Sequence, residues 1–70
     1  MKLSIEEQER LLNLNEHEED REREVSYRIL KSLEIDDVYC NIMKTHHILF
    51  AMSMFDHIIK ERNKQHNVTQ

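Results

Sequence analysis

The sequence of 70 residues contains no glycine, no proline and only one cysteine, Cys40. Strand-rich folds use glycine and proline in their turns and bulges, so the absence of both residues favours an all-α chain. A single cysteine excludes an intrachain disulfide and a CxxC-type metal motif, and a lone thiol is typical of proteins of the reducing cytosol. We therefore expect an all-α, cytoplasmic protein.

Long hydrophobic runs are also missing. The N-terminal segment "SIEEQER" lacks the uninterrupted apolar core of a secretory signal. The most apolar window, residues 42–59, contains five charged or histidine side chains, which argues against a membrane-spanning helix of about 20 apolar residues. We expect neither export nor insertion into a membrane.

The net charge of −4 is unevenly distributed. Residues 1–24 carry nine acidic and four basic side chains, whereas residues 25–70 carry five acidic and six basic ones. A nucleic-acid-binding chain usually presents a basic surface, so this distribution argues against direct binding of RNA or DNA. The acidic residues concentrate instead in the N-terminal third.

The N-terminal half predicts one helix over about residues 4–33. Ser4 is a suitable N-cap, with a glutamate three residues later as in a capping box. The run "NEHEEDRERE" at residues 15–24 has no apolar residue, so the alternative is a break near residues 15–20. An acidic residue four positions before an arginine stabilises a helix and therefore favours a continuous one here. The sequence has three such pairs: Glu6/Arg10, Glu19/Arg23 and Glu24/Arg28.

A second helix is predicted over about residues 37–64. The segment "LEIDDVY" is typical of a break between helices, with Asp36 as the N-cap of the second one. Basic residues cluster in its last turn, as the negative end of a helix prefers, and residues 65–70 form a polar tail. Because the two helices have similar lengths and a short connection, we expect an antiparallel hairpin in a single domain over residues 1–70.

The apolar residues of the 37–64 helix are not confined to one side. They surround the helix axis, which is typical of a helix buried on all sides, and the first helix can cover only one side. Chains this short bury too little apolar surface to be stable without support such as a partner chain. We therefore expect a homodimer through this helix, in the form of a four-helix bundle. The residues expected in the core or the dimer interface are Val25, Ile29, Leu33, Val38, Ile42, Leu49, Met52, Phe55 and Ile59.

The sequence predicts a small non-enzymatic regulator, inhibitor or adaptor that acts by binding another protein. Carboxylates spaced along an acidic helix can dock on a basic groove, for example that of a nucleic-acid-binding protein, and speed association. The same acidic run also fits a solvated face that keeps an apolar dimer soluble. The residues expected to contact a partner are Glu16, Glu18, Glu19, Glu22, Met43, Phe50 and Met54.

Two other classes of function are alternatives. The histidines, methionines and phenylalanines of "THHILFAMSMFDHII" could line a site for a metal, haem or a small molecule between subunits. However, Cys40 and His47 lie about 10 Å apart along a helix, and only His57 and Glu61 have the i,i+4 spacing of a ligand pair. We therefore expect no metal and no cofactor. The other alternative is a small RNA- or DNA-binding helical dimer.

Overall fold

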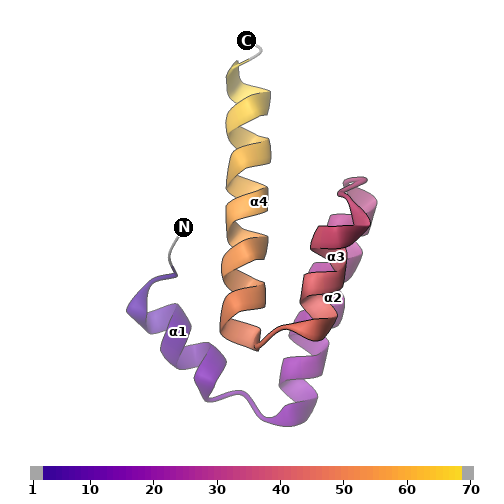
Figure 1. Cartoon of the computed structure of the whole chain (residues 1–70). Coiled ribbons are helices and arrows are strands. Elements are labelled where there is room, and N and C mark those ends of the chain that lie inside the picture. The colour runs from indigo at the N-terminus through magenta and orange to yellow at the C-terminus, as the bar shows by residue number, and fades with distance from the viewer. Residues whose placement is uncertain (1–2, 69–70) are drawn as a thin grey trace.

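The computed structural model describes residues 3–68 and the side chains of residues 3–64, and all regular structure in this part of the chain is helical. The four helices are α1 (Ile5–Leu12), α2 (Glu16–Ser32), α3 (Asp37–Thr45) and α4 (Ile48–Val68). Figure 1 shows that successive helices run in alternating directions, with α3 beside α2 and with α4 between α1 and the α2/α3 pair. The all-α prediction is confirmed, but the two-helix hairpin does not match, because each predicted helix is divided in two.

The first division lies at residues 13–15, where the sequence favoured a continuous helix. The side chain of Asn13 bonds the end of α1, with its Nδ2 at 2.8 Å from Glu9 O. Asn15 starts α2 through a capping box: its Oδ1 accepts a bond from the Glu18 amide at 2.8 Å, and the Glu18 carboxylate accepts one from the Asn15 amide at 3.0 Å. The acidic run is therefore helical, as expected, but it belongs to a separate helix.

The start of α1 and the surface ion pairs follow the prediction in part. The Ser4 hydroxyl accepts a hydrogen bond from the Glu7 amide at 3.1 Å, which confirms Ser4 as the N-cap, whereas the Glu7 carboxylate bonds Arg10 instead of completing the predicted capping box. The Glu7 carboxylate pairs with Arg10 and takes the place predicted for Glu6. The two other predicted pairs form as expected, Glu19 with Arg23 and Glu24 with Arg28.

A Schellman motif forms the turn between α2 and α3. The Ile35 amide donates to the Leu30 carbonyl at 3.1 Å, and the Glu34 amide donates to the Lys31 carbonyl at 3.0 Å. Glu34 occupies the position that is usually glycine, in the left-handed region with φ 59°. The turn falls at the predicted break, and Asp36 caps α3 as predicted.

Replacement of Glu34 by glycine is expected to stabilise the chain by about 1 kcal/mol, because a residue with a Cβ loses roughly that much in the left-handed conformation. Urea denaturation followed by far-UV circular dichroism measures the change. The matched control is Glu24→Gly in the middle of α2, where glycine should destabilise the helix by about 1 kcal/mol. The explanation of the turn fails if both substitutions lower stability equally.

The second division, between α3 and α4, contradicts the continuous helix predicted over residues 37–64. Helix α3 ends at Thr45, His46 is extended with φ −106° and ψ 161°, and α4 begins at Ile48. Helix α4 then runs opposite to α3 and reaches Val68, beyond the predicted end (Figure 1). This reversal lets α4 pack against α1, α2 and α3 of its own chain.

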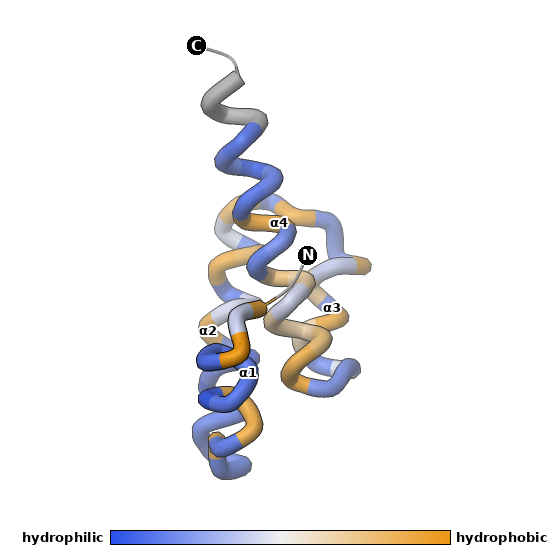
Figure 2. Tube along the Cα trace, turned by 90° about the vertical axis from the view of Figure 1, so that its left-hand side faces the viewer, coloured by the Kyte–Doolittle hydropathy of each residue, from blue (hydrophilic) through white to orange (hydrophobic). Residues whose placement is uncertain are grey.

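The core lies where α2, α3 and α4 meet. Leu30 of α2, Cys40 and Met43 of α3 and Ala51 of α4 form one fully buried cluster. Helix α1 packs on α4 and contributes a fully buried side chain, Leu11. Figure 2 shows hydrophobic bands on α4 beside the other helices and a mainly hydrophilic chain beyond them. In the described part of the chain, no helix is long and apolar enough to cross a membrane.

None of the nine residues predicted for the core or dimer interface is fully buried. Val25, Ile29 and Val38 are exposed, Val38 to 68%. The remaining six are half-buried, namely Leu33, Ile42, Leu49, Met52, Phe55 and Ile59. Met43, which was predicted to face a partner, is instead fully buried in the core of its own chain. Because the chain reverses after Thr45, α4 lies against α3, and Met43 is covered by its own chain in the cluster with Leu30, Cys40 and Ala51.

Candidate protein-binding surface

Large apolar side chains are exposed on all four helices. On α1, Ile5 and Leu12 are exposed to 74% and 61%. They are seven residues apart, so they lie on one side of the helix, away from the buried Leu11. The others are Val25 and Ile29 of α2, Val38 and Tyr39 of α3 and Phe50 of α4. Single exposed apolar residues are normal, but here every helix presents at least one.

The surface of the chain is larger than its mass predicts. The accessible surface is 5417 Å², whereas a compact monomer of 8.6 kDa exposes about 4,700 Å². The chain therefore exposes about 700 Å² more than a compact shape of this mass would. The radius of gyration of 12.6 Å also exceeds the roughly 11 Å of a compact domain of this length. Part of the excess comes from the end of α4, which extends beyond the other helices (Figure 1).

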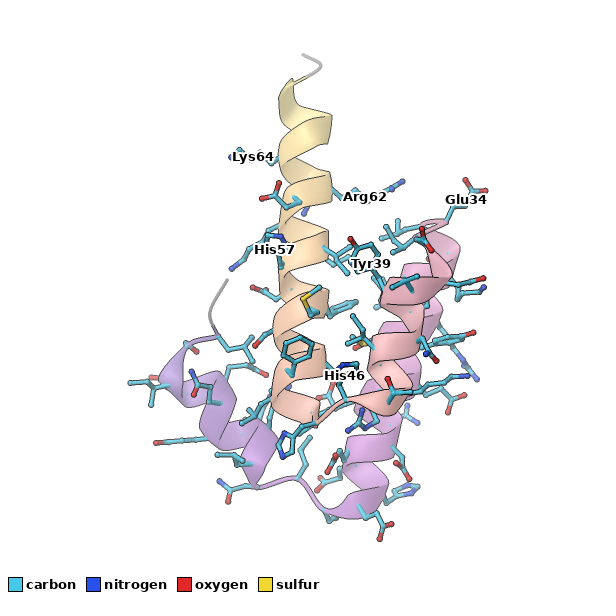
Figure 3. The ribbon with its side chains drawn as sticks, in the orientation of Figure 1. Glu34, Tyr39, His46, His57, Arg62 and Lys64 are labelled. Carbon is cyan, nitrogen blue, oxygen red and sulfur yellow. The ribbon has the colours of Figure 1, made fainter. Side chains whose placement is uncertain are left out.

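The outward side of α4 carries Phe50, Met54 and His57, which share one stripe because they are three and four residues apart. Phe50 is 47% exposed, Met54 is half-buried and His57 is exposed. The Phe50 ring stacks on the ring of His46, with 5.0 Å between the centroids. Figure 3 shows His46 where the chain turns from α3 into α4, and His57 farther up α4. Of the three apolar residues predicted to contact a partner, Phe50 and Met54 keep accessible surface and Met43 does not.

The acidic residues predicted to contact a partner are mostly engaged within the chain. Glu18 belongs to the capping box of α2, and Glu19 pairs with Arg23 at 3.1 Å. Glu22 pairs with an arginine of α1, and Glu16 is exposed in the first turn of α2. Docking of this face on a basic partner stays a prediction, and it would require three of the four carboxylates to exchange contacts inside the chain for contacts with the partner.

Arg10 is the ionic link between α1 and α2. Its guanidinium donates hydrogen bonds to Glu7 in its own helix and to Glu22 in α2. These two hydrogen bonds raise the pKa of Arg10 above its ordinary value, so the group stays charged. The side chain is 44% exposed, and pairs exposed to solvent contribute about 1 kcal/mol or less. Leu11, rather than this ion pair, therefore holds α1 on the rest of the chain.

Two connected grooves follow the seam between α2 and α3. The first has a volume of about 440 Å³ and is lined by Asp20, Arg23, Glu24, Tyr27, Arg28 and Lys44. The second continues from Tyr27 and Lys44 to Lys31, Asp37, Val38, Cys40 and Asn41.

The basic side chains of these grooves already have partners in the chain. Arg23 and Arg28 pair with glutamates of α2. Lys31 pairs with Asp37 at 3.0 Å, and this bond raises the pKa of Lys31. Lys44 Nζ lies 4.2 Å from the centroid of the Tyr27 ring. A phosphate group would have to compete with these contacts, so the grooves do not favour the nucleic-acid alternative.

The residues considered as metal ligands are not brought together. Within the described part of the chain, no three histidine, cysteine or acidic side chains are arranged to hold a metal ion. Cys40 is buried, and its thiol donates to the Ile35 carbonyl at 3.5 Å. His46 and His47 lie at the α3–α4 joint, whereas His57 lies farther along α4.

Comparison of the chain with protein-family models, with curated proteins and with solved structures gives no match in any of the three. A functional proposal therefore depends on the residues and the geometry of this chain.

Sequence reasoning missed two groups of residues. The first is the exposed pair Ile5 and Leu12, whose seven-residue spacing was a usable signal that they share one side of α1. The second is Arg23 and His47, which shape the α3–α4 joint through contacts to Met43 O and to the Leu49 amide. Neither contact has a sequence signal, because histidine is not among the preferred N-cap residues and Arg23 acts from another helix.

Proposed function

We propose that this protein is a small non-enzymatic regulator, inhibitor or adaptor that acts by binding other protein chains, and that it works as a homodimer through residues 37–64. The observation that supports the proposal is the apolar surface that one chain leaves uncovered. Apolar side chains are exposed on all four helices, among them Phe50 of α4 and Ile5 and Leu12 of α1.

A second copy of the chain is the partner that we propose for this surface. In a twofold dimer the same patch of both subunits meets, so the outward stripe of α4 would pack against its counterpart. Phe50 lies on this stripe, and buried aromatic residues contribute strongly to such interfaces. Other partners would then use the surface outside the stripe, including the apolar pair Ile5 and Leu12 on α1.

Sedimentation velocity of the full chain tests this proposal with one substitution on α4. Phe50→Ser should weaken the dimer about tenfold or more in Kd, because an aromatic residue inside an interface contributes more than about 1 kcal/mol. Ile5→Ser is the matched control, since it makes a similar change at a more exposed position outside residues 37–64, and it should leave Kd unchanged. The same loss in both variants would speak against an interface on α4.

A further inference from the structure

The joint between α3 and α4 lacks four backbone hydrogen bonds that a continuous helix would have at this place. Helix α3 ends with the bond from the His46 amide to the Ile42 carbonyl at 3.2 Å, and α4 starts with the bond from the Ala51 amide to the His47 carbonyl at 2.9 Å. The amides of residues 47–50, all in the described part of the chain, make no helical bond across the joint. The four donors and four acceptors released in this way need other partners.

One released acceptor, the Met43 carbonyl, is bound by Arg23 of α2. Arg23 Nη1 lies 2.7 Å from Met43 O, and its Nη2 lies 3.1 Å from Glu19 Oε1. In a continuous helix the Met43 carbonyl would accept a bond from the His47 amide instead. The side chain of Arg23 is only 18% exposed, so water competes weakly for this charged hydrogen bond. Arg23 therefore stabilises the bent form of the joint.

One released donor, the Leu49 amide, is capped by the His47 ring, whose Nδ1 accepts its bond at 3.2 Å. The connection consists of two residues, His46 and His47 (Figure 3). The chain has no glycine and no proline, so no residue of the joint prevents a helical backbone. The segment is therefore compatible with the bent form and with one continuous helix.

Helix α4 is the element that a second copy can supply. It packs against α1, α2 and α3 of its own chain, and one contact with α2 joins Ser26 Oγ to Met52 Sδ at 3.5 Å. An element connected by a short hinge can be exchanged between identical chains, because the same contacts form with the partner's copy. The two-residue connection before α4 is such a short hinge.

We infer that the dimer forms by exchange of α4 between two copies of this chain. In each copy the joint straightens, residues 37–68 become one helix about 48 Å long, and α4 packs on α1, α2 and α3 of the other copy. The exchanged dimer keeps the contacts of α4 and recovers the four backbone hydrogen bonds at each joint. It also brings the two straightened joints, with Phe50 of each copy, to the twofold axis. This inference rests on the proposed homodimer and gives its mechanism.

Disulfide formation between two differently substituted chains tests the exchange. Both chains carry Cys40→Ser, which removes the native thiol. One chain adds Ser26→Cys and the other adds Met52→Cys, at the contact between α2 and α4. The two are mixed in denaturant, refolded together and oxidised. Exchange places the two new cysteines opposite each other in mixed dimers, so about half of the chains should become covalently linked.

The control for this experiment is one chain that carries both new cysteines, which can form the disulfide in the closed or the exchanged form. Sedimentation of the refolded mixture then separates the two proposals. A dimer that forms without the mixed disulfide overturns the exchange and leaves the proposed homodimer intact. A chain that stays monomeric overturns both.

The variant His47→Pro tests the exchange independently. Proline at position 47 removes an amide that the straight helix needs and clashes with the preceding turn. His46, with φ −106° and ψ 161°, already has the conformation that a residue before proline prefers in the bent form. The dimer should weaken about a hundredfold or more, while the helix content measured by circular dichroism is retained.

The matched control is His47→Ala, which removes the same ring cap but allows the straight helix. This variant should dimerise at least as tightly as the wild type. An unchanged Kd of the His47→Pro variant would overturn the exchange of α4.

Discussion

Truncation of Leu30 to alanine is expected to destabilise the chain by about 2–5 kcal/mol, the range for removal of a buried leucine side chain. Leu30 is 0% exposed and belongs to the cluster with Cys40, Met43 and Ala51. A chain of this size rarely has more than about 3–5 kcal/mol of stability from its single core. The variant should therefore be largely unfolded at room temperature, with a low helical signal in far-UV circular dichroism.

Leu12→Ala is the matched control for this prediction. It makes the same truncation on α1, at a residue that is 61% exposed. Its expected loss is below about 1 kcal/mol, because little of the side chain leaves water on folding. Urea denaturation at equal protein concentration measures both variants. Similar losses for Leu30→Ala and Leu12→Ala would mean that Leu30 is not at the centre of the core.

Replacement of Arg23 by methionine is expected to destabilise the bent form of the chain by about 1.5–3 kcal/mol, the range for a hydrogen bond to a charged group. Methionine keeps an apolar stem in place of the aliphatic part of arginine and removes the guanidinium, so the Met43 carbonyl loses the donor that lies 2.7 Å away. If α4 is exchanged, the same substitution should also lower the Kd of the dimer, because the bent joint alone depends on Arg23.

Arg28→Met is the control for Arg23→Met. Arg28 pairs with Glu24 at the same i,i+4 spacing, but its side chain is 75% exposed, so the expected loss is within about 0.5 kcal/mol. Both variants lose one ion pair of α2, but only Arg23→Met also removes the hydrogen bond to the Met43 carbonyl. Urea denaturation gives the two stabilities and sedimentation gives the two dimer constants. Equal stabilities would remove Arg23 from the explanation of the joint.

The ends of the helices were the most predictable features of the fold, because caps are local. Ser4 and Asp36 cap α1 and α3 as expected. The break at residues 13–15 lies beside the one that the sequence offered as an alternative near residues 15–20, and its place was readable in principle, since Asn15 is followed three residues later by Glu18, as in a capping box. The long acidic run with its i,i+4 pairs obscured this signal, because the same pairs also favour an uninterrupted helix.

The joint between α3 and α4 could not be read from the sequence, because long-range contacts stabilise it. The segment around His46 and His47 contains no helix breaker, and Arg23, which binds the Met43 carbonyl, lies 20 residues earlier. The burial of Met43 follows from this joint, since α4 turns back on α3 and Met43 packs in a cluster with Leu30 and Ala51 of its own chain. Tertiary contacts thus overrode a correct local preference for helix.

The candidate surface was predictable only in part. The sequence showed that the 37–64 segment has apolar residues in many directions, and Phe50 is indeed exposed in the structure. The contacts of the acidic residues were harder to predict from the sequence. Glu22, for example, pairs with Arg10, which lies 12 residues earlier and in another helix. Spacing along the sequence predicts ion pairs within one helix. Ion pairs between helices can be predicted only when the fold is known.

Binding of a second copy is measured most directly by sedimentation equilibrium of the unsubstituted chain over a range of concentrations. We predict a mass of about 17 kDa in the micromolar range, twice the 8.6 kDa of one chain, with dissociation on dilution as expected for a reversible dimer. A mass of 8.6 kDa at every concentration would contradict the homodimer and, with it, the exchange of α4.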